Sequence, residues 1–258
     1  MLKLLTLIVA SLLAASQPAA PAESDDATQS ILEQLDAVGR DMTSLEAAVR
    51  KTDYDNITGQ EVIRRGRLYL RRDAEGKDVR FRVTFNGEER EGGGLIPRKK
   101  EYTLVGDRLV ERDYPTKTQI TRVLTPEQAG RDLLKLGEGP FPLPIGQSPE
   151  DVRKQFAVTT VDPTDEEQNL YDVPPIEGAT RIRLTPLPGT AFDGEYEWIE
   201  LDVDSKGFPR QVTTLQGPNL VISELRDPEL NKTMPDETFE LPPIDAGGWN
   251  VVVEEMAN

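Results

Sequence analysis

The stretch from Glu61 to Leu124 constrains the fold of this 258-residue chain more than any other feature. It consists of short runs in which apolar and polar residues alternate at a period of two, and glycine, aspartate or proline separates the runs. In the first run, for example, Leu68 and Leu70 fall on one face and Arg67 falls on the other. This pattern predicts consecutive antiparallel strands in a sheet with one apolar face and one solvated face. The rest of the chain must therefore cover the apolar face.

Residues 1–22 have the pattern of a signal peptide. Lys3 provides the positive charge, an apolar run follows, and a small-residue cleavage motif ends at Ala22. We therefore expect an exported mature chain that begins at Glu23. The chain has no cysteine, and a lipoprotein signal needs a cysteine to acylate, so no lipid anchor is expected. Residues 23–258 are interpreted as a single domain.

Further elements are expected on both sides of the central strands. Apolar residues at helical spacing predict a helix over about Ala27–Arg40, and helix-start signals predict two more, from Thr125 and from Ser148 to Phe156. Residues 44–54 either extend the first helix or form a strand, and their alternation favours the strand. Strands return in the last third, before a helical turn at residues 235–238 and an extended, proline-rich exit. These elements predict an α+β, mostly β fold: a curved antiparallel sheet of about nine to eleven strands, with helices on its concave face.

The composition excludes several classes of chemistry. The chain has no histidine and no cysteine, which removes Ser-His-Asp and Cys-His catalysis and the zinc sites built on those ligands. Its net charge of −16 disfavours binding to nucleic acid. No glycine cluster matches a nucleotide-binding motif, so we expect no cofactor. The acidic run Asp162–Glu167 is either a solvated loop or a calcium site, and no other metal site is expected.

Apolar residues on the predicted strands, helices and proline-rich loop form a candidate set for a cavity between the sheet and its cover. A filled core would show the same pattern and is the more ordinary interpretation from patterning alone, although curved sheets that close partly over helices often hold apolar ligands. The set comprises Leu68, Leu70, Phe81, Val83, Phe85, Tyr102, Leu104, Leu109, Leu133, Leu136, Phe141, Leu143 and Trp198.

Three groups of residues, in the same order along the chain, resemble motifs of the LolA-like outer-membrane lipoprotein carriers. The first runs from Ser44–Val49 to Gly66–Arg72 and is similar to the first two strands of that family. The second, Leu104–Leu109 with its continuation to Thr121, is similar to a family hairpin. The third, Asn231–Pro243, is similar to the closing strand. The resemblance therefore covers most of the mature chain.

The resemblance implies an unclosed β-barrel with an α-helical lid over an apolar cavity that holds lipoprotein acyl chains. It implies a monomeric, non-catalytic periplasmic carrier that receives its cargo from an inner-membrane donor complex and passes it to an outer-membrane acceptor. The family arginine that ties the sheet to the lid falls on Arg72, and one guanidinium can bond several carbonyl groups. The same fold also serves in envelope sensors and in lipid- or protein-binding modules, and this alternative stays open here.

Overall fold

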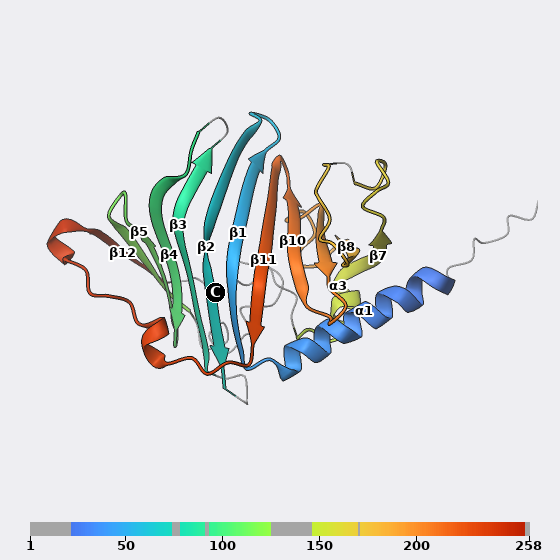
Figure 1. The fold of residues 1–258 in the computed structure, drawn as a ribbon, viewed down its shortest axis with the longest axis horizontal. Coiled ribbons are helices and arrows are strands. Elements are labelled where there is room, and N and C mark those ends of the chain that lie inside the picture. Colours follow the sequence, from blue (N-terminus) through green and yellow to red (C-terminus); the bar gives the residue numbers. More distant parts are fainter. Residues whose placement is uncertain (1–21, 74–77, 91–92, 125–145, 170, 256–258) are drawn as a thin grey trace, which may run out of the picture.

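The computed structural model describes residues 22–73, 78–90, 93–124, 146–169 and 171–255, which form a curved twelve-stranded sheet that does not close on itself (Figure 1). The predicted mostly β fold, an unclosed barrel with helices as its lid, is confirmed. The strands are β1 (Ser44–Asp55), β2 (Gln60–Arg72), β3 (Val79–Arg90), β4 (Ile96–Val105), β5 (Arg108–Asp113), β6 (Thr118–Val123), β7 (Phe156–Val161), β8 (Thr180–Pro186), β9 (Trp198–Val203), β10 (Pro209–Gln216), β11 (Asn219–Leu230) and β12 (Asn250–Glu255).

The sheet is built from two antiparallel meanders and one added strand. Its order is β12-β6-β5-β4-β3-β2-β1-β11-β10-β9-β8-β7. The strands from β1 to β6 and from β7 to β11 are each neighbours in chain order, and pairing of β1 with β11 joins the two halves, with Val49 opposite Leu225. β12 lies parallel to β6 at one edge of the sheet, with Val252 opposite Ile120.

Two helices lie on one face of this sheet. α1 (Ala22–Asp41) is longer at both ends than the predicted helix, and it contacts β7 and α3 (Pro149–Gln155). α3 starts where the sequence predicted, because the Ser148 hydroxyl caps it by accepting a hydrogen bond from the Asp151 amide at 3.1 Å. The helix predicted from Thr125 lies outside the described residues. No helix in the described part of the chain is long and apolar enough to cross a membrane.

The strand assignments mostly follow the sequence pattern. Residues 44–54 form β1, as their alternation favoured, and its apolar residues Leu45 and Ala47 are buried. The helical turn predicted at residues 235–238 is confirmed as the 3-10 helix η1 (Asp236–Phe239). The exit after it was predicted only as extended, and it contains a second short 3-10 helix, η2 (Ala246–Gly248), and β12. β12 brings the sheet one strand beyond the predicted upper count.

One glycine permits a close approach between two strands. The pairing of β2 with β3 shifts register between Arg65 and Gly66. A Cβ atom at Gly66 would lie 2.0 Å from the carbonyl oxygen of Thr84, so only glycine fits at this β-bulge.

Candidate functional site

The apolar face of the sheet carries most of the predicted cavity residues. Six of them are at most 3% exposed and belong to one hydrophobic cluster, and two more, half-buried, pack against its margin. We call the side of the sheet that they occupy the apolar face, and the opposite side the outer face. The six are Leu68, Leu70, Phe81, Val83, Phe85 and Leu104, and the two are Tyr102 and Leu109.

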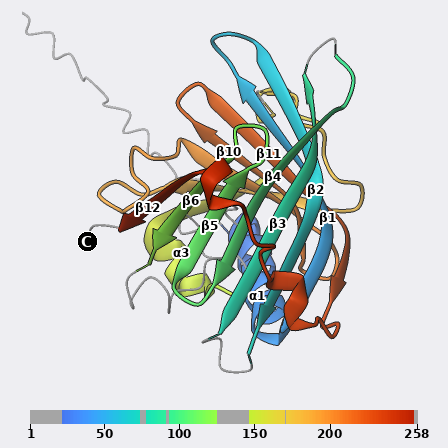
Figure 2. The same ribbon diagram turned by 90° about the vertical axis from the view of Figure 1, so that its left-hand side faces the viewer.

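The helices share this cluster with the strands. Leu32 and Leu35 of α1 and Val152 of α3 are each 2% exposed and belong to the same cluster. The apolar stripe of α1 therefore covers part of the apolar face, as the spacing of its residues predicted. Figure 2 shows α1 and α3 on the side of the sheet away from the C-terminal segment.

Arg72 links the sheet to the end of α1. Its Nε donates a hydrogen bond to the carbonyl oxygen of Met42, which directly follows the helix, and its backbone amide donates to the carbonyl of Thr43 at 2.9 Å. A hollow of about 250 Å³ lies beside this junction, lined by the last turns of α1 together with Leu230 and Asn231 at the end of β11. The guanidinium therefore bonds a carbonyl at the lid end, which is the contact that the latch hypothesis requires. Whether that contact controls opening is a prediction.

Five predicted cavity residues remain, and the structure places one of them. Leu133, Leu136, Phe141 and Leu143 lie outside the described residues. Trp198 lies in a separate outer-face cluster with Val173, Leu215 and Leu220, and its ring centroid is 5.8 Å from that of Tyr171. The reason is the two-residue period of a strand: Ile199 and Leu201 of β9 belong to the apolar cluster, and Trp198 faces the opposite way.

The alternation of the strands predicted a solvated outer face. In the structure, part of the outer face is buried. Arg181, Glu200 and Asp202 are at most 3% exposed, and the Arg181 Nη2 donates to the Asp202 carboxylate at 2.9 Å. Burial raises the pKa of Glu200 above its ordinary value, although Arg183 and Arg181 oppose the shift. This cluster is not recognisable in the sequence, because charged residues at alternate strand positions normally indicate solvent.

Two segments cover the outer face, and arginines bond the backbone of both. Near β8, Arg181 and Arg183 donate to the carbonyl oxygens of Val173 and Gln168, which lie in the connection between β7 and β8. Asp202 accepts from the amide of Ile176 in the same connection at 2.9 Å.

The second segment, residues 231–249, crosses the other half of the outer face, and we call it the C-terminal strap (Figure 2). Arg71, Arg82 and Arg112, on β2, β3 and β5, each donate a hydrogen bond to a carbonyl oxygen of the strap, at 2.6–2.8 Å. The acceptors are Met234, Thr238 and Pro242. Phe239 anchors the strap, since its side chain is 1% exposed and the Arg71 guanidinium lies 5.4 Å from its ring.

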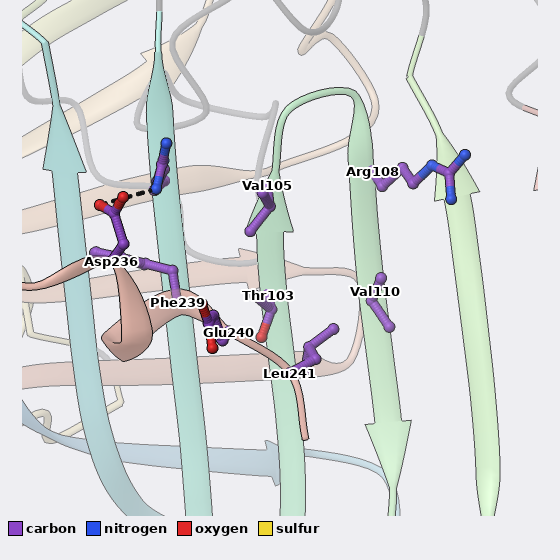
Figure 3. Close-up of a pocket in the computed structure, with 9 residues that line it drawn as sticks. Thr103, Val105, Arg108, Val110, Asp236, Phe239, Glu240 and Leu241 are labelled. Carbon is purple, nitrogen blue, oxygen red and sulfur yellow. Dashed lines mark ion pairs between the residues drawn. The ribbon is translucent and has the colours of Figure 1, made fainter. Parts of the chain in front are cut away.

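A pocket of about 540 Å³ lies between the strap and strands β3 to β5 (Figure 3). Its wall includes Val105 and Val110 from the sheet and Phe239 and Leu241 from the strap. Thr103 also lines it, and the hydroxyl of Thr103 is buried without a hydrogen-bond partner. An unpaired buried hydroxyl costs roughly 1–3 kcal/mol. No sequence pattern indicated this pocket, because the strap and the strands are far apart in the chain.

The acidic run Asp162–Glu167 uses its carboxylates for its own turns. Asp162 accepts hydrogen bonds from the amide and hydroxyl of Thr164, and Asp165 accepts from the amide of Glu167. Hydrogen bonding from Thr164 lowers the pKa of Asp162. Within the described ranges, no three acidic side chains converge closely enough to hold a metal ion.

Comparison with known proteins yields similarities to solved structures alone. No protein-family model matches the chain, and no curated protein matches it. The chain is similar to an uncharacterized conserved protein from Thermus thermophilus, at 14% identity and a TM-score of 0.47, over 88% of this chain and 99% of that one.

Two further similarities concern named bacterial proteins. One is to the Pseudomonas aeruginosa MucA/MucB complex, at 13% identity and a TM-score of 0.45, over 84% of this chain and 61% of that one. The other is to a LolA superfamily protein from Nitrosomonas europaea, at 13% identity and a TM-score of 0.35, over 83% and 97%. Values this low assign no function. The chain is similar to LolA superfamily proteins, as its sequence motifs predicted.

Proposed function

We propose that this protein is a periplasmic carrier that binds lipoprotein acyl chains at the apolar face of its sheet and carries them towards the outer membrane. The observation that supports the proposal most is the contiguous apolar cluster on one face of an unclosed sheet, covered in part by α1. Residues of four neighbouring strands, from β2 to β5, contribute to this cluster or its margin.

The driving force would be burial of hydrocarbon. Each methylene group removed from water contributes roughly 0.8 kcal/mol, so several acyl chains together offset the cost of ordering the complex. Apolar contacts are not directional. A lipid chain can therefore take the place of lid side chains such as Leu32 and Leu35 without leaving a polar group unpaired.

The proposed latch is the hydrogen bond from Arg72 to the carbonyl of Met42. It holds the junction of α1 and β1, and a guanidinium can exchange one carbonyl partner for another as a helix moves. The donor complex in the inner membrane and the acceptor in the outer membrane belong to the proposal, as do export, cleavage after Ala22 and a monomeric state. No catalytic step is proposed.

Native mass spectrometry tests the proposal. The full-length chain is expressed with its N-terminal segment and purified from the periplasm, and bound material is extracted with solvent. We expect co-purified acyl lipid or lipoprotein, and an amount that changes in Arg72→Ala, because α1 is then held less firmly over the apolar face and acyl chains displace it more easily. Arg67→Ala is the matched control, since Arg67 lies on the same strand and makes an exposed ion pair with Glu46.

A clean apo mass, with no uptake of a fluorescent fatty acid, would refute the carrier proposal. The better account would then be the alternative function of this fold, a non-catalytic envelope sensor or binding module with a filled core and a protein partner.

A further inference from the structure

The pocket beneath the C-terminal strap lies on the face opposite the proposed acyl site. Its size, about 540 Å³, falls in the range of small-molecule sites, roughly 300–1,000 Å³. One wall is the outer face of β3, β4 and β5, and the other is the strap (Figure 3). A ligand here would contact none of the apolar-face residues, so the pocket is independent of the proposed carrier function.

Strand register places an apolar floor beside two arginines. Val105 of β4 pairs with Arg108 of β5, and Arg80 of β3 also lines this end of the pocket. In the next row Thr103 pairs with Val110. Val105 is 43% exposed, although β4 is paired with a strand on each side. The pocket therefore offers apolar surface that no part of the described chain covers.

The floor also contains a buried polar group without a hydrogen-bond partner, the hydroxyl of Thr103. Thr103 is 1% exposed, and its hydroxyl makes no hydrogen bond. Figure 3 shows this hydroxyl on the side of β4 that faces Glu240 and Leu241 of the strap. Buried hydroxyl groups are nearly always paired, but this one is closed to water and therefore to a ligand, so it is a cost to the fold and not a contact that the pocket offers.

The rim of the pocket already binds a carboxylate. Asp236 of the strap lies 3.1 Å from the Arg80 guanidinium, the ion pair dashed in Figure 3, and it also pairs with Arg71. The Asp236 side chain is 63% exposed, so a competing anion can reach the same arginines. Arg108, across Val105, is 69% exposed, and the Asp107 carboxylate lies 3.8 Å from its guanidinium. The rim therefore carries guanidinium groups that can exchange one carboxylate for another. An incoming acid competes there with Asp78, which also pairs with Arg80, and meets Glu240 in the pocket wall.

We propose that this pocket binds a small amphiphilic carboxylate, an aliphatic chain that ends in one carboxylate group. The chain packs on Val105, Val110 and the strap residues Phe239 and Leu241. The carboxylate pairs with the rim arginines in competition with Asp236.

Isothermal titration calorimetry with decanoate below its micelle concentration tests this proposal on the full chain. We expect one saturable decanoate site in the pocket, and it differs from acyl binding at the apolar face by its dependence on Val105. Val105→Trp fills the pocket and should abolish this site. Asp236→Asn should tighten binding there, because a competing carboxylate is lost. Arg65→Ala is the matched control, an exposed arginine on the neighbouring strand β2.

Two further titrations distinguish decanoate binding in this pocket from non-specific apolar binding and from binding at the apolar face. Methyl decanoate, which has no charge, should bind at least tenfold more weakly than decanoate. Arg72→Ala, which alters the proposed latch on the other face, should leave decanoate affinity unchanged. Absence of binding, or decanoate affinity equal in wild type and Val105→Trp, would overturn the proposal. Neither result would bear on whether acyl lipid co-purifies at the apolar face.

Discussion

The two faces of the sheet are both buried over long stretches, but by different kinds of contact. On the apolar face, side chains such as Leu68 and Phe81 contact other apolar side chains. On the outer face, Arg82 and Arg181 donate hydrogen bonds to backbone carbonyls of the two segments that cover it. The first kind of contact is non-directional, so another apolar surface can replace the cover. The second depends on the position of individual carbonyl groups and holds one segment in one place. The cover of the apolar face can therefore be exchanged for another apolar surface, whereas the segments on the outer face are held in place.

The largest effect is expected from breaking the outer-face cluster around Arg181. Arg181→Ala leaves Asp202 buried without its cation, whereas Glu200 keeps its ion pair with Arg183. Removing one partner of a buried ion pair costs about 3–5 kcal/mol. Urea denaturation measures the loss in free energy of unfolding. Exposed Arg65 is the control, and Arg65→Ala should cost at most about 1 kcal/mol. Equal losses in both variants would show that the cluster does not hold the connection between β7 and β8.

A similar loss in the free energy of unfolding, spread over the whole sheet, is expected from a change on the apolar face. Leu68→Ala creates a cavity and should reduce the free energy of unfolding by about 2–5 kcal/mol. Hydrogen exchange then separates the two faces. In Leu68→Ala, protection should fall across the whole sheet, whereas in Arg181→Ala it should fall first at the amides of Val173 and Ile176. If protection in Leu68→Ala also fell first at these two amides, the two faces would not differ as proposed.

Two buried glutamates on the outer face should respond oppositely to pH. Burial acts to raise the pKa of Glu101, but hydrogen bonds from Tyr114 and Arg82 outweigh it and hold the pKa below the ordinary 4.5. Its stabilising contribution is therefore present above pH 4.5 and is lost as pH falls through the folded pKa. For Glu200, burial outweighs Arg183 and raises the pKa above 4.5, so its contribution is present below pH 4.5 and is lost as pH rises through the folded pKa.

Denaturation over a pH series from about 7 to about 4 measures both signs. On acidification, Glu101→Gln should lose less free energy of unfolding than wild type, and Glu200→Gln should lose more. Parallel curves for the two variants would contradict the assigned directions.

The smallest effect is expected at the pocket beneath the strap. Thr103→Val replaces an unpaired buried hydroxyl by a methyl group of the same shape, so it should raise the free energy of unfolding by up to about 1 kcal/mol. Thr52→Val is a second case, since the Thr52 hydroxyl is also buried without a partner. Thermal unfolding measures both. A loss of stability in Thr103→Val would indicate that its hydroxyl has a partner.

The sequence predicted the apolar face well and the outer face poorly, for a physical reason. Apolar burial repeats with the period of the strand, so Leu68, Leu70 and Phe81 are recognisable one by one. An arginine on the other face has the same pattern whether it meets water or a backbone carbonyl. Arg82 and Arg181 therefore cannot be told from solvated arginines by their pattern, although both hold other segments of the chain.

The candidate site was predictable to the same extent. The predicted residues on β2 to β5 lie in one cluster or at its margin, because they follow one another in a meander. That they line a cavity stays a prediction. Trp198 was placed with them by size and apolar character, although its position next to Ile199 puts it on the other face. β12 was missed because three consecutive valines show no alternation, and its partner β6 lies more than a hundred residues earlier.

The pairing of β1 with β11 has a consequence for how the chain folds. Hairpins within each meander need only local contacts, but Leu45 meets Leu230 across most of the chain. Contacts of such high contact order form slowly, because a long loop must close before any of them stabilises the fold. Until β11 is available, β1 is an open edge onto which another chain can add. Folding should therefore end with the joining of two preformed half-sheets, and the chain is most prone to aggregation just before that step.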